Sequence, residues 1–317
     1  MSLTLLRAGI LTTVQDLGRS GWRRCGINPN GPMDPVAARV ANLLAGNDEN
    51  NALLEMHFPA AEIRFDSAVT FAICGGDFSA ELDREPVGNW RSFLATKGST
   101  LHFTGKMTGE RSYLAVRGGL DIPLWLGSAS TNLNARVGGL DGRKLQAGER
   151  IGLRNAEAQH SPVRAVSPYL LPHYSRFPTV RIVPGPEYEY LSKSSRKALT
   201  SQNFTISPRS NRMGFQLDGE PLSLGEPREL ISSAVTFGTI QLLPDGQLIV
   251  LMADQQTAGG YPRIAHVISY DLPLVGQLGA GDKVAFHMVE YTDAERLMLH
   301  LEEELSLLRV ACRFQSR

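Results

Sequence analysis

Short apolar runs separated by glycine and proline make up most of the chain. The 31 glycines and 18 prolines interrupt runs such as AVTFAIC at 68–74, VRIVP at 180–184 and KVAFHMV at 283–289, with further runs at 113–116 and 248–252. Runs of this length, rich in β-branched and aromatic residues and bounded by turn residues, are typical of β-strands. Their spacing predicts a mainly β protein built from barrels or sandwiches.

Two segments instead repeat their apolar residues at the helical period. Asp34 can cap a helix that starts at Pro35, and Gly46 ends the apolar pattern that follows. Near the C-terminus, Thr292 and Glu295 have the spacing of a capping box, and leucines recur at helical spacing after them. The sequence predicts a short helix after Asp34, a terminal helix from residue 292, and a weaker helical segment at 187–199.

The stretch 251–273, LMADQQTAGGYPRIAHVISYDLP, has the pattern of two strands joined by a polar loop. Gly259 and Gly260 can adopt positive φ, and Pro262 suits the first position of a strand. Turn chemistry does not require the acid, amides, hydroxyl and phenol that the loop also carries. We therefore treat this loop as a candidate site.

Proline density indicates where the chain divides. The segment 155–178 carries four prolines and little periodicity, as a linker would. We expect an N-terminal β domain at 1–165, a second β domain at 178–290 and a C-terminal helical extension at 292–317. A chain of 317 residues with 42% hydrophobic residues is long enough for two domains with cores of their own.

Charge and cysteine content narrow the class of protein. Lysine plus arginine equals aspartate plus glutamate, 32 against 32, so no basic field attracts nucleic acid or anionic lipid. No apolar run has the length of a membrane span, and the N-terminus lacks the features of a secretory signal. Cys25, Cys74 and Cys312 show neither a disulfide framework nor zinc spacing. We expect a cytoplasmic protein that binds neither nucleic acid nor a membrane.

Standard catalytic and nucleotide motifs do not match. The chain has no GxxxxGK[ST], no GxGxxG after a strand, no HExxH and no GxSxG, and its seven histidines lack metal-ligand spacing. Three polar clusters remain, around residues 12–34, 207–214 and 254–262. Arginines in them can hold carboxylates or phosphates through two hydrogen bonds. Asp16 and Asp254 can act as bases, or can cap turns and pair with those arginines.

Five ordered motifs give the chain a family resemblance. TTVQDLGRSGW at 12–22, NGPMDPVAARVANLLAGN at 30–47, RSYLAVRGGLDIPLWLGSASTNL at 111–133, SPRSNRMGFQLDG at 207–219 and GGYPRIAHVISYDLPLVGQLGAGDKV at 259–284 resemble the biotin-dependent carboxyltransferase family, in its allophanate hydrolase subunit 2 branch. The resemblance extends from about residue 8 to residue 290. The family usually has serine where this chain has Asn30, and a Gly-Pro pair where it has Phe58-Pro59-Ala60.

The resemblance implies a fold of two cyclophilin-like β-barrel domains with a few short helices. The branch includes the C component of ATP-dependent 5-oxoprolinase, which implies ring opening of 5-oxo-L-proline to L-glutamate with ATP hydrolysis. The implied partners are the B component, of allophanate hydrolase subunit 1 type, and the A component, of lactam-utilisation type. ATP would be shared by the complex.

Such a reaction needs a cation for the substrate carboxylate, donors for the developing oxyanion and a base for water. The three clusters supply these residue types. We predict Asp16, Asp254 and Tyr261 as catalytic residues. The predicted substrate- or partner-binding residues are Arg19, Asn30, Arg209, Asn211, Arg212, Gln255 and Thr257. No metal site is predicted.

Two other functions fit the same resemblance. One is the carboxyltransferase half of a urea carboxylase or another biotin-dependent enzyme. It would need biotin on a carrier supplied in trans, because the only Lys-Met pair is Lys106-Met107 and no Ala-Met-Lys-Met carrier motif is present. The other is a non-catalytic regulator of Kip type, which binds an inhibitor of a histidine kinase. A biotin requirement would identify the first, and activity in an assembled complex would separate both enzymes from the regulator.

Overall fold

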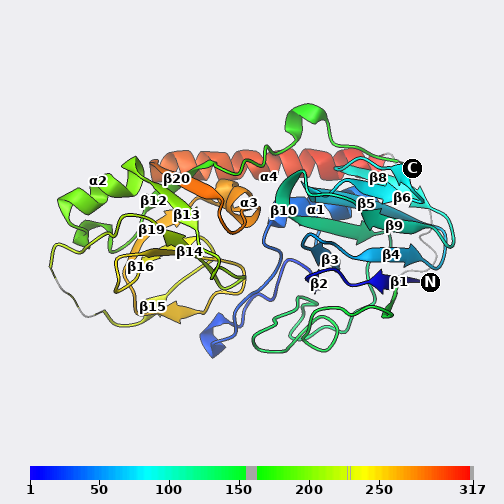
Figure 1. Cartoon of the computed structure of the whole chain (residues 1–317), viewed down its shortest axis with the longest axis horizontal. Coiled ribbons are helices and arrows are strands. Elements are labelled where there is room, and N and C mark those ends of the chain that lie inside the picture. The colour runs from blue at the N-terminus through cyan, green and yellow to red at the C-terminus, as the bar shows by residue number, and fades with distance from the viewer. Residues whose placement is uncertain (155–162, 227, 229, 315–317) are drawn as a thin grey trace. The chain divides into compact units, whose positions relative to one another are not determined.

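The computed structural model describes residues 1–154, 163–226, 228 and 230–314, and its chain divides into two compact units (Figure 1). Unit 1 contains Met1–Arg19, Asn30–Tyr174 and Glu304–Arg317, and unit 2 contains Ser20–Pro29 and Ser175–Glu303. The chain therefore leaves unit 1 after Arg19 and returns to it at Asn30. Part of the predicted linker, 155–162, lies outside the described residues.

The predicted mainly β fold is confirmed, with 33% of the described residues in strands and 20% in helices. Each apolar run named above coincides with a strand. These strands are β5 (Val69–Asp77), β10 (Thr108–Val116), β12 (Thr179–Pro184), β17 (Leu248–Leu251) and β20 (Lys283–Met288).

Unit 1 contains two sheets. The six-stranded sheet has the order β11-β1-β4-β9-β6-β7, and the five-stranded sheet has the order β2-β3-β10-β5-β8. The remaining strands are β1 (Ser2–Arg7), β2 (Thr12–Gln15), β3 (Leu53–Met56), β4 (Glu62–Phe65), β6 (Ala80–Leu82), β7 (Glu85–Pro86), β8 (Arg91–Ala95), β9 (Thr100–Phe103) and β11 (Arg150–Gly152). Side chains from both sheets form one apolar core, in which Phe65 of β4 stacks on Phe71 of β5 with ring centroids 4.9 Å apart.

Helix α1 (Pro35–Ala45) forms as predicted. The carboxylate of Asp34 accepts a hydrogen bond from the Ala37 amide at 2.9 Å, and Pro35 occupies the first turn. Gly46 ends the helix in the left-handed conformation, with φ of 83°, where a residue without a Cβ is favoured. The helix packs on β5 and β10 through buried residues such as Val40 and Leu44, which do not belong to the apolar cluster shared by the two sheets.

Unit 2 is built on a closed barrel of seven strands in the order β12-β19-β16-β17-β14-β13-β20. β12 and β20 pair in parallel to close the ring, and the other pairs are antiparallel. The remaining barrel strands are β13 (Asn203–Ile206), β14 (Gly214–Asp218), β16 (Thr239–Leu242) and β19 (Arg263–Val267). Outside the ring, β15 (Ser233–Ala234) pairs with β18 (Ala258–Gly259).

The polar loop at 251–273 does join two strands, β17 and β19, but these two do not form a hairpin. Each pairs with β16, which lies between them. Gly259 and Gly260 do not use the positive φ that glycine can adopt. A Cβ on Gly259 would lie 2.7 Å from Nε2 of Gln241, so this glycine allows a close approach of the Gln241 side chain.

The helical predictions in the second half of the chain are partly correct. The segment at 187–199 divides into a 3-10 turn, η3 (Tyr188–Tyr190), and α2 (Lys193–Ser201), because Ser192 caps a new helix through the amide of Ser195. A further short 3-10 turn and helix, η4 (Ser269–Asp271) and α3 (Leu272–Gly276), precede β20, and two more 3-10 turns are η1 (Arg23–Cys25) and η2 (Pro168–Leu170). The terminal helix α4 runs over Tyr291–Phe314.

Candidate functional site

In unit 1, Asp16 is the acceptor at the centre of a buried hydrogen-bond network. Its side chain accepts from the hydroxyls of Ser128 and Ser130 at 2.6 and 2.7 Å, from the Ala129 amide at 2.6 Å and from the Gly18 amide at 2.9 Å. The residue is 5% exposed. Four donors on one carboxylate fix the loop after β2 against the turn at 127–131.

Arg19 and Asn30 face each other where the chain leaves and re-enters unit 1. The guanidinium of Arg19 donates to the side-chain oxygen of Asn30 and to the carbonyl of Ser130, and it lies 4.9 Å from the ring centroid of Trp125. Asn30 has φ of 59°, which asparagine adopts more readily than most residues. Its side-chain oxygen also accepts from Nδ2 of Asn132 at 3.3 Å. The departure from the family's usual serine thus falls at a left-handed position.

The loop between Asn30 and α1 rests on a buried acid and two tyrosines. Glu55 accepts from the Met33 amide and the Tyr113 hydroxyl, both at 2.8 Å, and the Tyr113 oxygen accepts from the Asp34 amide at 2.9 Å. The hydroxyl of Tyr174 donates to Asp34 at 2.7 Å. Burial, and then the neighbouring carboxylates, raise the pKa of both tyrosines well above the ordinary value, so they remain neutral donors.

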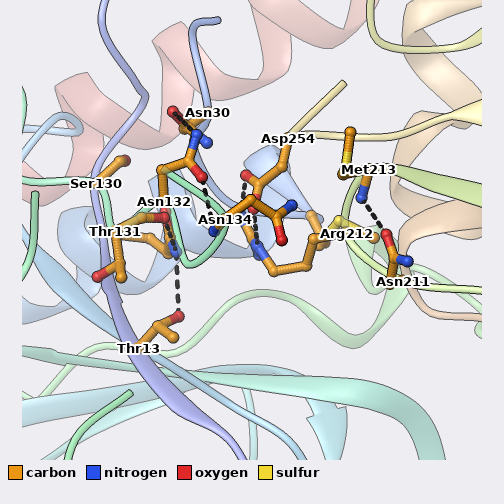
Figure 2. Close-up of polar contacts among 12 residues, drawn as sticks. Thr13, Asn30, Ser130, Thr131, Asn132, Asn134, Asn211, Arg212, Met213 and Asp254 are labelled. Carbon is orange, nitrogen blue, oxygen red and sulfur yellow. Dashed lines mark hydrogen bonds and ion pairs between the residues drawn. The ribbon is translucent and has the colours of Figure 1, made fainter. Parts of the chain in front are cut away.

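In unit 2, Arg212 and Asp254 bring the second and third polar clusters together. Nε and Nη2 of Arg212 donate to the two oxygens of Asp254 at 3.0 and 3.1 Å, and both side chains are nearly inaccessible to solvent (Figure 2). Asn28 donates through Nδ2 to the carbonyl of Asp254 at 2.9 Å. From the sequence, Asp254 was either a base or the ion-pair partner of an arginine. In the structure it forms an ion pair with Arg212.

The loops on either side of this ion pair are held by backbone contacts. The side-chain oxygen of Asn211 accepts from the Met213 amide at 2.8 Å, which closes a turn beside Arg212 (Figure 2). Gln255 is 2% exposed; in the amide orientation that satisfies both ends, its nitrogen donates to the Ala253 carbonyl at 3.0 Å and its oxygen accepts from Phe237. Both predicted residues therefore adjoin the Arg212–Asp254 pair along the chain.

The remaining predicted residues of unit 2 differ in setting. Arg209 has a 70% exposed side chain, 3.7 Å from a carboxylate oxygen of Asp218. Thr257 accepts from the Val235 amide at 3.2 Å through its backbone carbonyl. Tyr261 is 47% exposed and lines a pocket of about 420 Å³ with Arg228 and apolar residues. The described lining of that pocket includes neither Arg212 nor Asp254.

Several residues of these networks are missing from the predicted site. Ser128 and Ser130 do not have the spacing of a nucleophile elbow, although their motif is one of the five that carry the resemblance. Glu55 and Tyr113 lie inside strands, where polar residues at buried positions were the available signal. Within the described ranges, no three His, Cys, Asp or Glu side chains gather as a metal site requires.

Comparison with known proteins shows which protein family the chain belongs to. The family model for the carboxyltransferase domain, subdomains A and B, matches residues 25–288. The chain belongs to this family, as the motifs and the β architecture indicated.

Among its relatives, the C component of 5-oxoprolinase from Escherichia coli is 36% identical over 314 residues, which cover 99% of each protein. A putative urea carboxylase of Emericella nidulans is 30% identical over 98% of this chain and 26% of its own length. The crystal structure of K. lactis urea amidolyase superposes with a TM-score of 0.91 at 27% identity, over 97% of this chain and 20% of that protein. The described part of the chain has no helix long and apolar enough to cross a membrane.

Proposed function

We propose that the chain is the C component of an ATP-dependent 5-oxoprolinase, which converts 5-oxo-L-proline to L-glutamate. The observation that carries this proposal is the 36% identity with the C component of a 5-oxoprolinase over 99% of both proteins. The match to the putative urea carboxylase of Emericella nidulans has a lower identity, 30%.

The reaction needs activation because the amide of a lactam resists attack by water. In the proposed sequence, the γ-phosphoryl group of ATP is transferred to the amide oxygen and ADP leaves. Water then adds to the ring carbon, the C–N bond breaks with protonation of the nitrogen, and a second water releases phosphate to give L-glutamate. The protein has to hold the substrate carboxylate, donate to the developing negative charge and accept a proton from water.

Exposed residues of unit 2 suit the first two tasks. We assign the substrate carboxylate to Arg209, whose guanidinium is largely exposed and only loosely paired with Asp218. Tyr261, also exposed, would donate through its phenol to the developing oxyanion. Asn211 and Thr257 would complete the polar surface next to the substrate.

The buried residues suit a positioning task. Arg212, Asp254 and Gln255 would hold the loops that carry Arg209 and Tyr261. Arg19 and Asn30 would hold the two ends of the loop at 20–29. Asp16 and Asp254 remain the proposed bases. Each carboxylate already accepts hydrogen bonds, so a base role requires one of these bonds to open during turnover.

ATP and the two partner proteins complete the proposal. The sequence contains no complete nucleotide motif, so we assign ATP to a site supplied wholly or partly by the B-type or the A-type component described above. The complex would act in the cytoplasm.

The test is reconstitution. The chain is co-expressed with its neighbouring B-type and A-type components, and glutamate and ADP formation from 5-oxoproline and ATP are measured with and without it. Turnover should depend on this chain; turnover that continues without it would refute the proposal. Tyr261→Phe and Arg209→Gln should lower turnover by about tenfold or more while the complex still assembles, since each removes one charge-stabilising donor.

The family assignment also supports a second candidate, the carboxyltransferase half of a biotin-dependent enzyme. The TM-score of 0.91 with K. lactis urea amidolyase favours this function. Biotin would then be the cofactor, carried by another protein. Transfer of CO2 from carboxybiotin to urea by the purified chain would support this candidate, and a reconstituted oxoprolinase that needs no biotin would exclude it.

A further inference from the structure

A pocket of about 620 Å³ lies in unit 1, beside the C-terminal end of α1. Its lining comes from four places along the chain: Leu17 after β2, the end of α1 with the turn at 46–51, Arg117 and Gly118 after β10, and the last turns of α4. The volume is in the range of small-molecule sites. None of the residues assigned above to the 5-oxoprolinase reaction lines it.

Some charged side chains of the pocket form ion pairs, and others have no carboxylate nearby in the described part of the chain. Glu49 accepts from Arg39 at 2.6 Å and forms an ion pair with Arg309 at 2.5 Å, so its negative charge is already balanced by two guanidinium groups. Arg117 and Arg313 also line the pocket, and neither has a carboxylate within ion-pair distance among the described residues. Asp48 supplies the only other acidic side chain in the described lining.

A further arginine lies behind the pocket wall. Arg164 is 4% exposed and donates to the carbonyls of Leu44 and Cys312 at 3.3 and 2.9 Å, near the C-terminal ends of α1 and α4. Burial, and then the charge of Arg164, lower the pKa of Arg117. The pocket wall thus holds positive charges close enough to disfavour one another, a condition that a bound anion relieves.

Arg117 itself retains donors. A guanidinium has five N–H groups, and that of Arg117 makes one hydrogen bond within the described structure, to the Gly46 carbonyl at 3.3 Å. Gly46 leaves room for this side chain, because a Cβ at that position would overlap Nη1 of Arg117. Arginine with donors in reserve is suited to two-point recognition of a phosphate or carboxylate.

We propose that this pocket is a binding site for a small anionic molecule, which it holds through a phosphate or carboxylate group on Arg117 and Arg313. The ion pairs of Glu49 with Arg39 and Arg309 hold the turn at 46–51. The anion would occupy the space between the end of α1 and the end of α4, where it offsets the charge of Arg117 and Arg164.

The test is calorimetric titration of the full chain with inorganic phosphate and, separately, with L-glutamate at low ionic strength. Arg117→Gln and Arg313→Gln should each weaken binding by about tenfold or more, because a charge-assisted hydrogen bond is lost. Arg7→Gln is the matched control, since Arg7 lies in unit 1 with an 83% exposed side chain outside the pocket, and it should bind as the wild type does. Saturable binding of phosphate identifies a phosphorylated ligand, and saturable binding of glutamate identifies a carboxylate ligand.

Arg313 is exposed on the last turn of α4, so its substitution tests the site even if Arg117→Gln fails to fold. Saturable binding of neither anion would overturn the proposal, as would wild-type affinity in Arg313→Gln. The readout is binding to the isolated chain, so the result is independent of whether the reconstituted complex cleaves 5-oxoproline.

Discussion

Arg212 and Asp254, 42 positions apart in the sequence, form a buried ion pair in which two guanidinium nitrogens each face one carboxylate oxygen. Removal of either partner leaves a charge that is screened from water and has lost its main counterion. We expect Asp254→Ala to lower the free energy of unfolding by about 3–5 kcal/mol, and Arg212→Ala to do the same.

Urea unfolding of the purified chain measures this effect. Arg209→Ala, in the same polar cluster but exposed, should change the free energy of unfolding by less than about 0.5 kcal/mol. The double variant should cost less than the sum of the two single changes, because the second truncation removes the charge that the first left unpaired. Additive costs would show that the two side chains are energetically independent.

Asp16 organises unit 1 through its four hydrogen bonds. Asp16→Asn keeps the size of the side chain, but an amide cannot accept from all four donors, so at least one buried N–H or O–H loses its partner. We expect a loss of about 2–4 kcal/mol in the free energy of unfolding. Ser128→Ala removes one donor to Asp16 and the acceptor of the Ser130 amide, and it should cost less, about 1–2 kcal/mol. Equal stability of Asp16→Asn and the wild type would contradict the hydrogen-bond assignment.

Gly46 is required for two separate reasons, its positive φ and its proximity to Arg117. Gly148 is a matched control, since its φ of 86° is close to the 83° of Gly46 but a Cβ there meets nothing within 4 Å. Gly148→Ala should cost about 1 kcal/mol for the left-handed backbone alone. Gly46→Ala should cost up to about 1 kcal/mol more, because the flexible end of Arg117 must move aside. Thermal or urea unfolding of the two variants gives the difference, and equal costs would show that Arg117 moves aside without a measurable penalty.

His266 of β19 makes the stability of unit 2 dependent on pH. Burial lowers the pKa of this histidine below its ordinary value of 6.5, so the unfolded chain binds a proton more readily than the folded one. Stability is therefore complete above pH 6.5 and decreases as pH falls from 6.5 toward the lowered pKa of the folded state.

His266→Gln should flatten the dependence of the urea midpoint on pH between about pH 7.5 and pH 5. His287, exposed on β20, is the control, and His287→Gln should leave the slope as it is in the wild type. A slope that His266→Gln leaves unchanged would assign the pH dependence to other groups.

Local signals in the sequence were sufficient to predict where several strands lie and where helix α1 begins and ends. Asp34, Pro35 and Gly46 act on backbone groups within a few residues of themselves, so the start and end of α1 follow from the sequence alone. The strands β5, β12 and β20 could be predicted in the same way, because consecutive residues determine whether a segment has the apolar pattern of a strand. The order of motifs along the chain also sufficed to indicate the family.

Tertiary structure decided which elements became neighbours and which polar residues met. The loop after β17 has the sequence of a hairpin connection, yet β16 pairs with both flanking strands, because closure of a seven-stranded ring sets the strand order. Asp16 reaches Ser128 over 112 positions and Arg212 reaches Asp254 over 42. The pocket beside Arg117 likewise exists only where α1, β10 and α4 end together. Hydrogen bonds and ion pairs act over a few ångströms of space, and spacing along the chain does not determine which distant residues come that close.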